Sequence, residues 1–307
     1  MKNILDLKTL ADFLEHFKDE ETCRAHFAGI RFRNGEYCPH CGHKQIYSFR
    51  NGKRYRCAEC KRDFTIVTGT VFGETKLPLK KWFIAIYLLS TTSKGISSIQ
   101  LAKHVGVTQK TGWFMDHRLR EAIKKNGGQL FGTVEADETY VGGAEKNKHS
   151  KKRTKGTEGR SVKTKTPVLG VAQRGGPVQA QVIDRVTGET AQKFIRLNVA
   201  QGSAVHTDDF RAYDNLVSFY PHSVVNHNAG QYVLGNVHTN TIESFWALFK
   251  RGYHGVYHWM SRKHMQRYVD EFAFRWNVRP GTQDEVFANV VERITESDRL
   301  TYKELIA

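Results

Sequence analysis

The sequence lacks any long apolar run. Its longest, Trp82–Leu89, is far shorter than the roughly 20 residues that a membrane-spanning helix needs. Residues 1–17 contain neither an uninterrupted apolar stretch nor a small-residue cleavage site, which argues against a secretory signal peptide. We therefore expect an intracellular, cytoplasmic protein with no membrane partner and with reduced cysteines.

Acidic residues are scarce relative to basic ones. The 307 residues include 47 Lys and Arg but only 31 Asp and Glu, which gives a formal net charge of +16. Such an excess favours a polyanionic partner, nucleic acid before anionic membrane. A basic but otherwise ordinary soluble enzyme is the alternative. The length and the 39% hydrophobic content allow two domains with a buried core.

Cysteine is rare, and four of the five cysteines form two pairs with two residues between the members of each pair. These are Cys38, Cys41, Cys57 and Cys60. Fifteen residues separate the pairs, a spacing typical of a structural zinc site. The spacer alternates apolar and polar residues and predicts a β-hairpin with strands over 46–50 and 54–56. We predict a zinc ribbon over residues 31–70 whose four thiolates fill the coordination shell of Zn²⁺. A disulfide or redox pair is the alternative.

A helix-turn-helix is predicted within residues 76–127, after an N-terminal helical segment over residues 1–30. The helical period is interrupted at Gly106, and Thr108 is placed to cap the second helix. In such a motif the first turn of the second helix faces the major groove of DNA. The base-facing candidates are Gln109, Lys110 and Thr111. A plain helical hairpin is the alternative.

The second half alternates strands and helices. Residues 130–282 read as three strands followed by helix, strand, helix, strand and helix, the element order of an α/β fold of the ribonuclease-H-like type. An insertion over 144–166 is strongly basic, and we expect it to contact DNA phosphates through Lys151, Lys152 and Arg153. A C-terminal helical segment follows over 283–307.

Three acids are placed to share metal ions. Asp137 lies in the first of these strands, Asp208 ends a later strand, and Glu243 lies on the polar face of a predicted helix. Three converging carboxylates can hold two Mg²⁺ ions that clamp the attacking and leaving oxygens of a phosphodiester. Asp209 is the rival of Asp208, but neighbouring strand residues point to opposite faces, so only one of the two faces the ions.

Four further residues near these acids need an interpretation. Strand alternation predicts that Glu135 shares the face of Asp137 and that Glu138 points away from the metals. For His227 and His238 we favour a structural role over polarising water or binding phosphate.

Several motifs together resemble the bacterial insertion-sequence transposases of the DDE class, in particular the ISXO-type group with an N-terminal zinc ribbon. The matching segments are "CPHC…CAEC", "VEADETYVGG", "HTDDFRAY" and the long block beginning "VNHNAGQYVLGNVHTNTIESFWALFK". The resemblance implies a ribonuclease-H-like core, two Mg²⁺ or Mn²⁺ ions, and cleavage and strand transfer of an insertion sequence at its terminal inverted repeats. It also implies double-stranded DNA partners, a synaptic homodimer or larger assembly, and association with the nucleoid.

The resemblance also implies roles for individual residues. Asp137, Asp208 and Glu243 match the three catalytic acids, and Lys250 matches the basic residue that follows the third acid. Lys250 lies two helical turns after Glu243, on the same helix face. Asn240, one turn before Glu243, is the alternative third ligand or its supporting partner. The alternative function is a DNA-binding regulator or domesticated transposase without catalysis, which would have no physical reason to gather acids that repel phosphate.

Overall fold

A computed structural model describes residues 7–50, 52–124, 127–143, 145–155, 161–226 and 233–307. The chain forms two compact units. Met1–Lys124 and Val278–Ala307 form the first, and Lys125–Asn277 forms the second. Within the described ranges, no helix is both long enough and apolar enough to cross a membrane.

The first unit is mainly helical, and both ends of the chain contribute to it. Its helices are α1 (Leu10–His16), α2 (Glu20–Arg31), α3 (Leu79–Thr91), α4 (Ser98–Val105), α5 (Gln109–Ala122), α9 (Gln283–Glu296) and α10 (Tyr302–Ile306). An aromatic cluster joins them: the ring of Phe287 lies 5.4 Å from Phe13 and 5.6 Å from Phe17, and Phe17 lies 4.9 Å from Phe83. Helix α9 therefore completes a core that α1 and α3 begin.

The zinc-ribbon segment of this unit is a small antiparallel sheet. Its strands are β1 (Ile46–Ser48), β2 (Tyr55–Cys57) and β3 (Asp63–Phe64), in the order β1-β2-β3. The expected hairpin is present, with each strand three residues long, and β3 adds a third strand that the sequence pattern did not indicate.

Helices α4 and α5 follow one another across a tight turn in the first unit, as both the helix-turn-helix and the plain helical hairpin predict. Ser97 caps α4 by accepting from the Gln100 N–H, and Thr108 caps α5 by accepting from the Thr111 N–H. Gly106 ends α4 in a left-handed conformation, φ 65° and ψ 57°, which glycine adopts with little steric cost.

The second unit contains a five-stranded mixed sheet. Its strands are β4 (Thr133–Val141), β5 (Thr166–Gln173), β6 (Val178–Val182), β7 (Ala204–Asp208) and β8 (His222–Val225), in the order β6-β5-β4-β7-β8. β5 runs antiparallel to both of its neighbours, whereas β4, β7 and β8 are mutually parallel. This strand order and direction are those of the ribonuclease-H-like fold, so the predicted fold class is confirmed.

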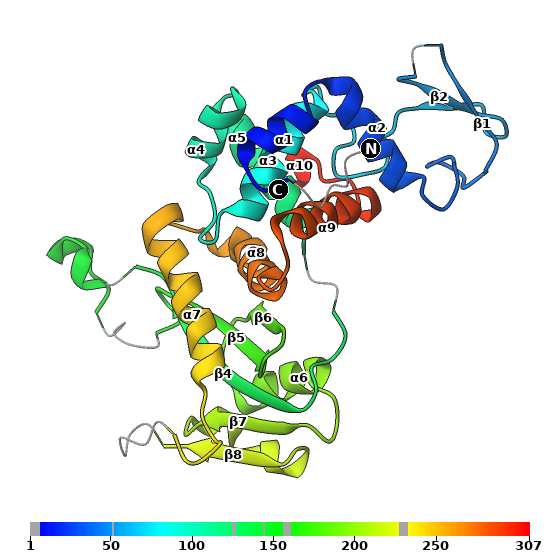
Figure 1. Cartoon of the computed structure of the whole chain (residues 1–307). Coiled ribbons are helices and arrows are strands. Elements are labelled where there is room, and N and C mark those ends of the chain that lie inside the picture. Colours follow the sequence, from blue (N-terminus) through cyan, green and yellow to red (C-terminus); the bar gives the residue numbers. More distant parts are fainter. Residues whose placement is uncertain (1–6, 51, 125–126, 144, 156–160, 227–232) are drawn as a thin grey trace. The chain divides into compact units, whose positions relative to one another are not determined.

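Helices cover both faces of this sheet (Figure 1). They are α6 (Gly188–Asn198), α7 (Asn240–Gly252) and α8 (Met265–Val278), with a π-helix over Tyr253–Tyr257 and 3₁₀ turns over Glu145–Asn147, Ser150–Lys152, Arg211–Ser218 and Arg262–His264. One core joins α7 and α8 to β5 and β6, and a second joins α6 and the turn over Arg211–Ser218 to the other face.

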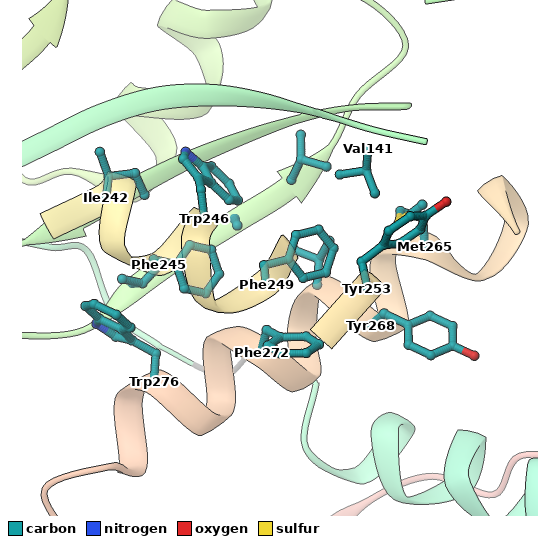
Figure 2. Packing of buried hydrophobic residues seen from close by; sticks show 14 of the residues in the cluster. Val141, Ile242, Phe245, Trp246, Phe249, Tyr253, Met265, Tyr268, Phe272 and Trp276 are labelled. Carbon is teal, nitrogen blue, oxygen red and sulfur yellow. The ribbon is translucent and has the colours of Figure 1, made fainter. Parts of the chain in front are cut away.

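Aromatic side chains hold α7 between the sheet and α8 (Figure 2). Phe245 meets Trp276 edge to face at 5.9 Å, and Phe249 meets Phe272 at 5.2 Å. Trp246 lies directly over Gly170 of β5, where an added Cβ would be 2.5 Å from the indole Cζ2. The helix can approach the sheet this closely because residue 170 has no side chain.

We expect Gly170→Ala to destabilise the second unit by about 1–3 kcal/mol, because Trp246 and Ile242 must shift to admit the methyl group. Denaturant unfolding of the full chain measures the change. Gly255→Ala is the matched control, since an added Cβ there meets nothing within 4 Å. Equal stability of the two variants would contradict the close packing of α7 on β5.

Candidate active site

Two aspartates lie side by side on neighbouring parallel strands. Glu135 of β4 is paired with His206 of β7, so Asp137 in the middle of β4 and Asp208 at the end of β7, each two residues further on, are next to one another. Carboxylate oxygens of Asp137, Glu138 and Asp208 all lie within 4.8 Å of one another. Asp209, the rival of Asp208, is not in this group, and the choice between the two as a metal ligand stays a prediction.

Glu138 belongs to this carboxylate cluster, so the expectation that it points away was wrong. Its carboxylate is buried, and its Oε2 accepts a hydrogen bond of 2.9 Å from the hydroxyl of Tyr213. Tyr213 lies in the 3₁₀ turn that follows Asp208. Strict alternation of strand faces failed here because the glutamate side chain is long. Tyr213, which follows β7 along the chain, holds the Glu138 carboxylate near those of Asp137 and Asp208.

The cluster concentrates negative charge. Burial, followed by the charges of Glu138 and Asp208, raises the pKa of Asp137 to about 8, and the charge of Glu243 adds to this shift. Like charges held together in a low-dielectric site favour a proton or a cation among them. The donor set is all oxygen, which suits hard divalent cations such as Mg²⁺ or Mn²⁺. The residues present therefore fit a divalent metal site.

The proposed third ligand lies on α7. Glu243 is exposed and lies close enough for its charge to act on Asp137, although it is not among the three acids that lie within 4.8 Å of one another. Its Oε1 accepts a 2.7 Å hydrogen bond from the hydroxyl of Thr239. Asn240 and Lys250 are also exposed on this helix. The choice between Glu243 and Asn240 remains a prediction.

Glu135 anchors the start of α7 to the sheet. Its carboxylate is completely buried. Oε2 accepts from the backbone N–H groups of Thr241 at 2.6 Å and Ile242 at 3.1 Å, and Oε1 accepts from the Thr241 hydroxyl at 2.9 Å. Thr239, the residue before the helix, makes no side-chain cap. A strand carboxylate thus satisfies the free N–H groups that begin α7, where negative charge is favoured.

Arg174 neutralises Glu135 and holds the segment that leads into α7. Its Nε donates to Glu135 Oε1 at 2.8 Å, while its terminal nitrogens donate to the carbonyls of Asn236 at 2.6 Å and His238 at 3.0 Å. Burial and the charge of Arg174 lower the pKa of His206, whose Nδ1 lies 3.1 Å from the guanidinium. A neutral imidazole can accept this hydrogen bond.

Of the two histidines that we expected to have structural roles, the structure describes one. His238 Nδ1 lies 3.2 Å from Glu135 Oε1, which places it in the anchor of α7. His227 lies outside the described residues. Arg174 could not be identified from the sequence. It lies in the turn after β5, and only the folded chain places it against the segment that leads into α7.

The four paired cysteines converge in the first unit. Their sulfurs all lie within 4.8 Å of one another, with Cys38–Cys60 at 3.7 Å and Cys41–Cys57 at 3.6 Å. Four sulfurs at the usual Zn–S distance of 2.3 Å are about 3.8 Å apart in a tetrahedron, whereas a disulfide requires about 2 Å. Burial alone would raise the pKa of Cys57, but the N–H groups of Cys60 and Glu59 hold it below its ordinary value. The site suits structural zinc.

The predicted DNA-contacting residues lie at the surface or partly so. Gln109 and Lys110 are exposed in the first turn of α5. Gln109 donates to Ser98 Oγ at 3.0 Å, and Lys110 Nζ lies 4.8 Å from the ring of Tyr302. Thr111 is half-buried. The predicted residues of the basic insertion, Lys151, Lys152 and Arg153, are exposed, whereas residues 144 and 156–160 lie outside the described ranges.

Comparison with known proteins finds a match for each of the two sites, the carboxylate cluster and the cysteine cluster. The ISXO2-like transposase domain matches residues 129–277, and the transposase zinc-ribbon domain matches residues 18–63. The chain is 33% identical over 284 residues to the "Uncharacterized protein in transposable element ISH50" of Halobacterium salinarum, covering 88% of this chain and 96% of that protein. The chain belongs to the ISXO2-like transposase family. Its carboxylate cluster is therefore the candidate active site of a DDE-type transposase.

Two further similarities to this ISXO2-like transposase are shorter or weaker. An uncharacterized transposase-like protein of Haemophilus influenzae is 32% identical over 101 residues, covering 33% of this chain and 80% of that protein. The crystal structure of the Mos1 strand transfer complex contains a chain with 16% identity and a TM-score of 0.28, covering 73% of this chain and 78% of that one. A TM-score this low carries no weight, and the fold assignment rests on the strand order.

Glu135→Gln should destabilise the transposase by about 3–5 kcal/mol, because it leaves Arg174 largely buried without its counter-ion. Denaturant unfolding provides the measurement. The double variant Glu135→Gln/Arg174→Met is the matched control and should recover part of the loss, since neither charge then remains. A loss below about 1 kcal/mol in the single variant would show that the pair does not anchor α7.

Proposed function

We propose that this chain is the transposase of an insertion sequence, which cleaves DNA at terminal inverted repeats and joins the freed ends to target DNA. The observation that carries the proposal is the group of carboxylates on the neighbouring strands β4 and β7, Asp137, Glu138 and Asp208, with Glu243 acting on it electrostatically. A protein that only binds DNA gains nothing from acids that repel phosphate, so this arrangement favours catalysis over regulation.

Asp137, Asp208 and Glu243 are the proposed holders of two Mg²⁺ or Mn²⁺ ions. When bound, such ions lower the pKa of an attacking hydroxyl and stabilise the leaving oxygen. The protein supplies no nucleophilic side chain. In cleavage, water attacks phosphorus and the bond to the 3′ oxygen breaks. In strand transfer, the freed 3′-hydroxyl attacks a target phosphodiester, so one P–O bond forms as another breaks.

Cationic residues would position the DNA. Lys250 lies seven residues beyond Glu243 on α7, about 10 Å along the helix axis, where an ammonium group can pair with a phosphate near the reacting one. The first turn of α5 and the basic insertion are the proposed contacts for terminal repeats and flanking duplex. Because two DNA ends must be held together for transposition, we propose that the active form is a dimer or larger.

We expect Asp137→Ala to abolish cleavage and strand transfer while leaving DNA binding intact, because the carboxylate holds metal rather than DNA. The substrate is the DNA that flanks the protein's own gene, with Mg²⁺, and joined products are read on a gel. Asp214→Ala, at an exposed acid beyond the cluster, is the control and should retain activity. Joined products from the Asp137→Ala protein would overturn the proposed function.

The same cleavage and strand-transfer assay distinguishes Glu243 from Asn240 as the third metal ligand. Asn240→Ala should lower the rate by about 10- to 100-fold, the usual cost of removing a group that supports a metal ligand. Glu243→Gln should cost more than this, because it removes a charged ligand itself. A larger loss for Asn240→Ala than for Glu243→Gln would assign the ligand to Asn240.

A further inference from the structure

Trp259 is the most exposed large hydrophobic residue of the described chain. The residue is 71% exposed, although its neighbours in the chain are held in place. The next residue, Met260, is buried in the core beneath α7 and α8. The hydroxyl of Tyr257 donates to Glu271 Oε1 at 2.9 Å, and its ring lies 4.9 Å from that of Tyr268. Trp259 is therefore exposed on a segment whose neighbouring residues are packed and hydrogen-bonded.

The backbone around Trp259 is irregular. Helix α7 passes into a π-helix over Tyr253–Tyr257, and His258 then has a positive φ of 58° with ψ −30°. Two short hydrogen bonds hold this turn, from the His258 N–H to the Tyr253 carbonyl at 2.7 Å and from the Trp259 N–H to the Tyr257 carbonyl at 2.6 Å. A positive φ is unfavourable for a residue other than glycine, and π-helical turns occur frequently at functional sites.

The surrounding surface is cationic. Residues 250–264 include four Lys or Arg and three His but no Asp or Glu. The exposed members of this set are Lys250, Arg251, His254, His258, Arg262 and Lys263. Arg262 pairs with Asp184 at 2.9 Å. The segment begins on the exposed face of α7, which also carries Glu243, so a DNA strand in the carboxylate site could continue along it.

We propose that Trp259 stacks on an unpaired base of the DNA strand whose phosphates follow this cationic segment. An indole among cations is typical of sites that bind single-stranded nucleic acid, where every base offers a flat face for stacking. Of the neighbouring apolar residues, Tyr253 and Met260 are buried and Val256 and Tyr257 are partly buried, so the segment presents one fully exposed ring rather than the broad apolar patch that a protein partner needs. The proposal rests on the proposed function only in taking DNA as the partner.

The test compares two DNA probes bound by the full chain in Ca²⁺, in which binding is measured without relying on cleavage. One probe is a short blunt duplex, and the other is the same duplex with a single-stranded tail of a few nucleotides. Trp259→Ala should weaken binding to the tailed duplex by about 5- to 100-fold and leave blunt-duplex binding unchanged. Trp259→Phe should retain most of the affinity for the tail. Lys263→Ala should weaken both probes alike, because it removes a phosphate contact.

Two outcomes would overturn the stacking role. One is an equal loss on both probes with Trp259→Ala. The other is unchanged binding to the tailed duplex with Trp259→Ala; an altered oligomeric state of that variant in light scattering would then make the ring part of a protein interface. If the wild-type chain binds neither probe, the DNA partner itself fails. If it binds both but Asp137→Ala still cleaves, the catalytic assignment fails while the role of Trp259 stands.

Discussion

The buried carboxylate of Glu135 determines where α7 begins. A strand side chain takes the place of a helix cap, and its charge is balanced by Arg174, which also holds the carbonyls of Asn236 and His238. Because Glu135 and Asp137 lie on the same strand, this contact fixes the helix that carries Glu243 relative to the aspartate. The close packing of Trp246 over Gly170 holds the same helix further along the sheet.

Two groups of acids on one strand have opposite environments. Glu135 is neutralised inside the protein by a guanidinium and by helix N–H groups, so it is structural. Asp137 and Glu138 instead face Asp208, and burial with mutual repulsion raises the pKa of Asp137 to about 8. The first arrangement is complete without a ligand. The negative charge of the second group is balanced only when a proton or a cation binds there. This difference separates a binding site from a structural ion pair.

Much of this could be predicted from the sequence, because spacing and alternation are local. The two cysteine pairs, the caps at Ser97 and Thr108, and the strand and helix order all follow from neighbouring residues. Prediction failed for Glu138, whose position depends on Tyr213, a contact between residues 75 positions apart. It could not find Arg174 for the same reason. Strand alternation placed Glu135 on the face of Asp137, but it could not show that Glu135 binds the N–H groups at the start of α7.

We propose that α7 is held so that Glu243 completes a metal site with Asp137 and Asp208. The most direct measurement is the anomalous diffraction of crystals soaked in Mn²⁺. We expect Mn²⁺ coordinated by Asp137 and Asp208, with the Glu243 carboxylate as a further ligand. Mn²⁺ bound by Asp137, Glu138 and Asp208 with Glu243 left in solvent, or no Mn²⁺ beside Asp137 and Asp208, would contradict this arrangement.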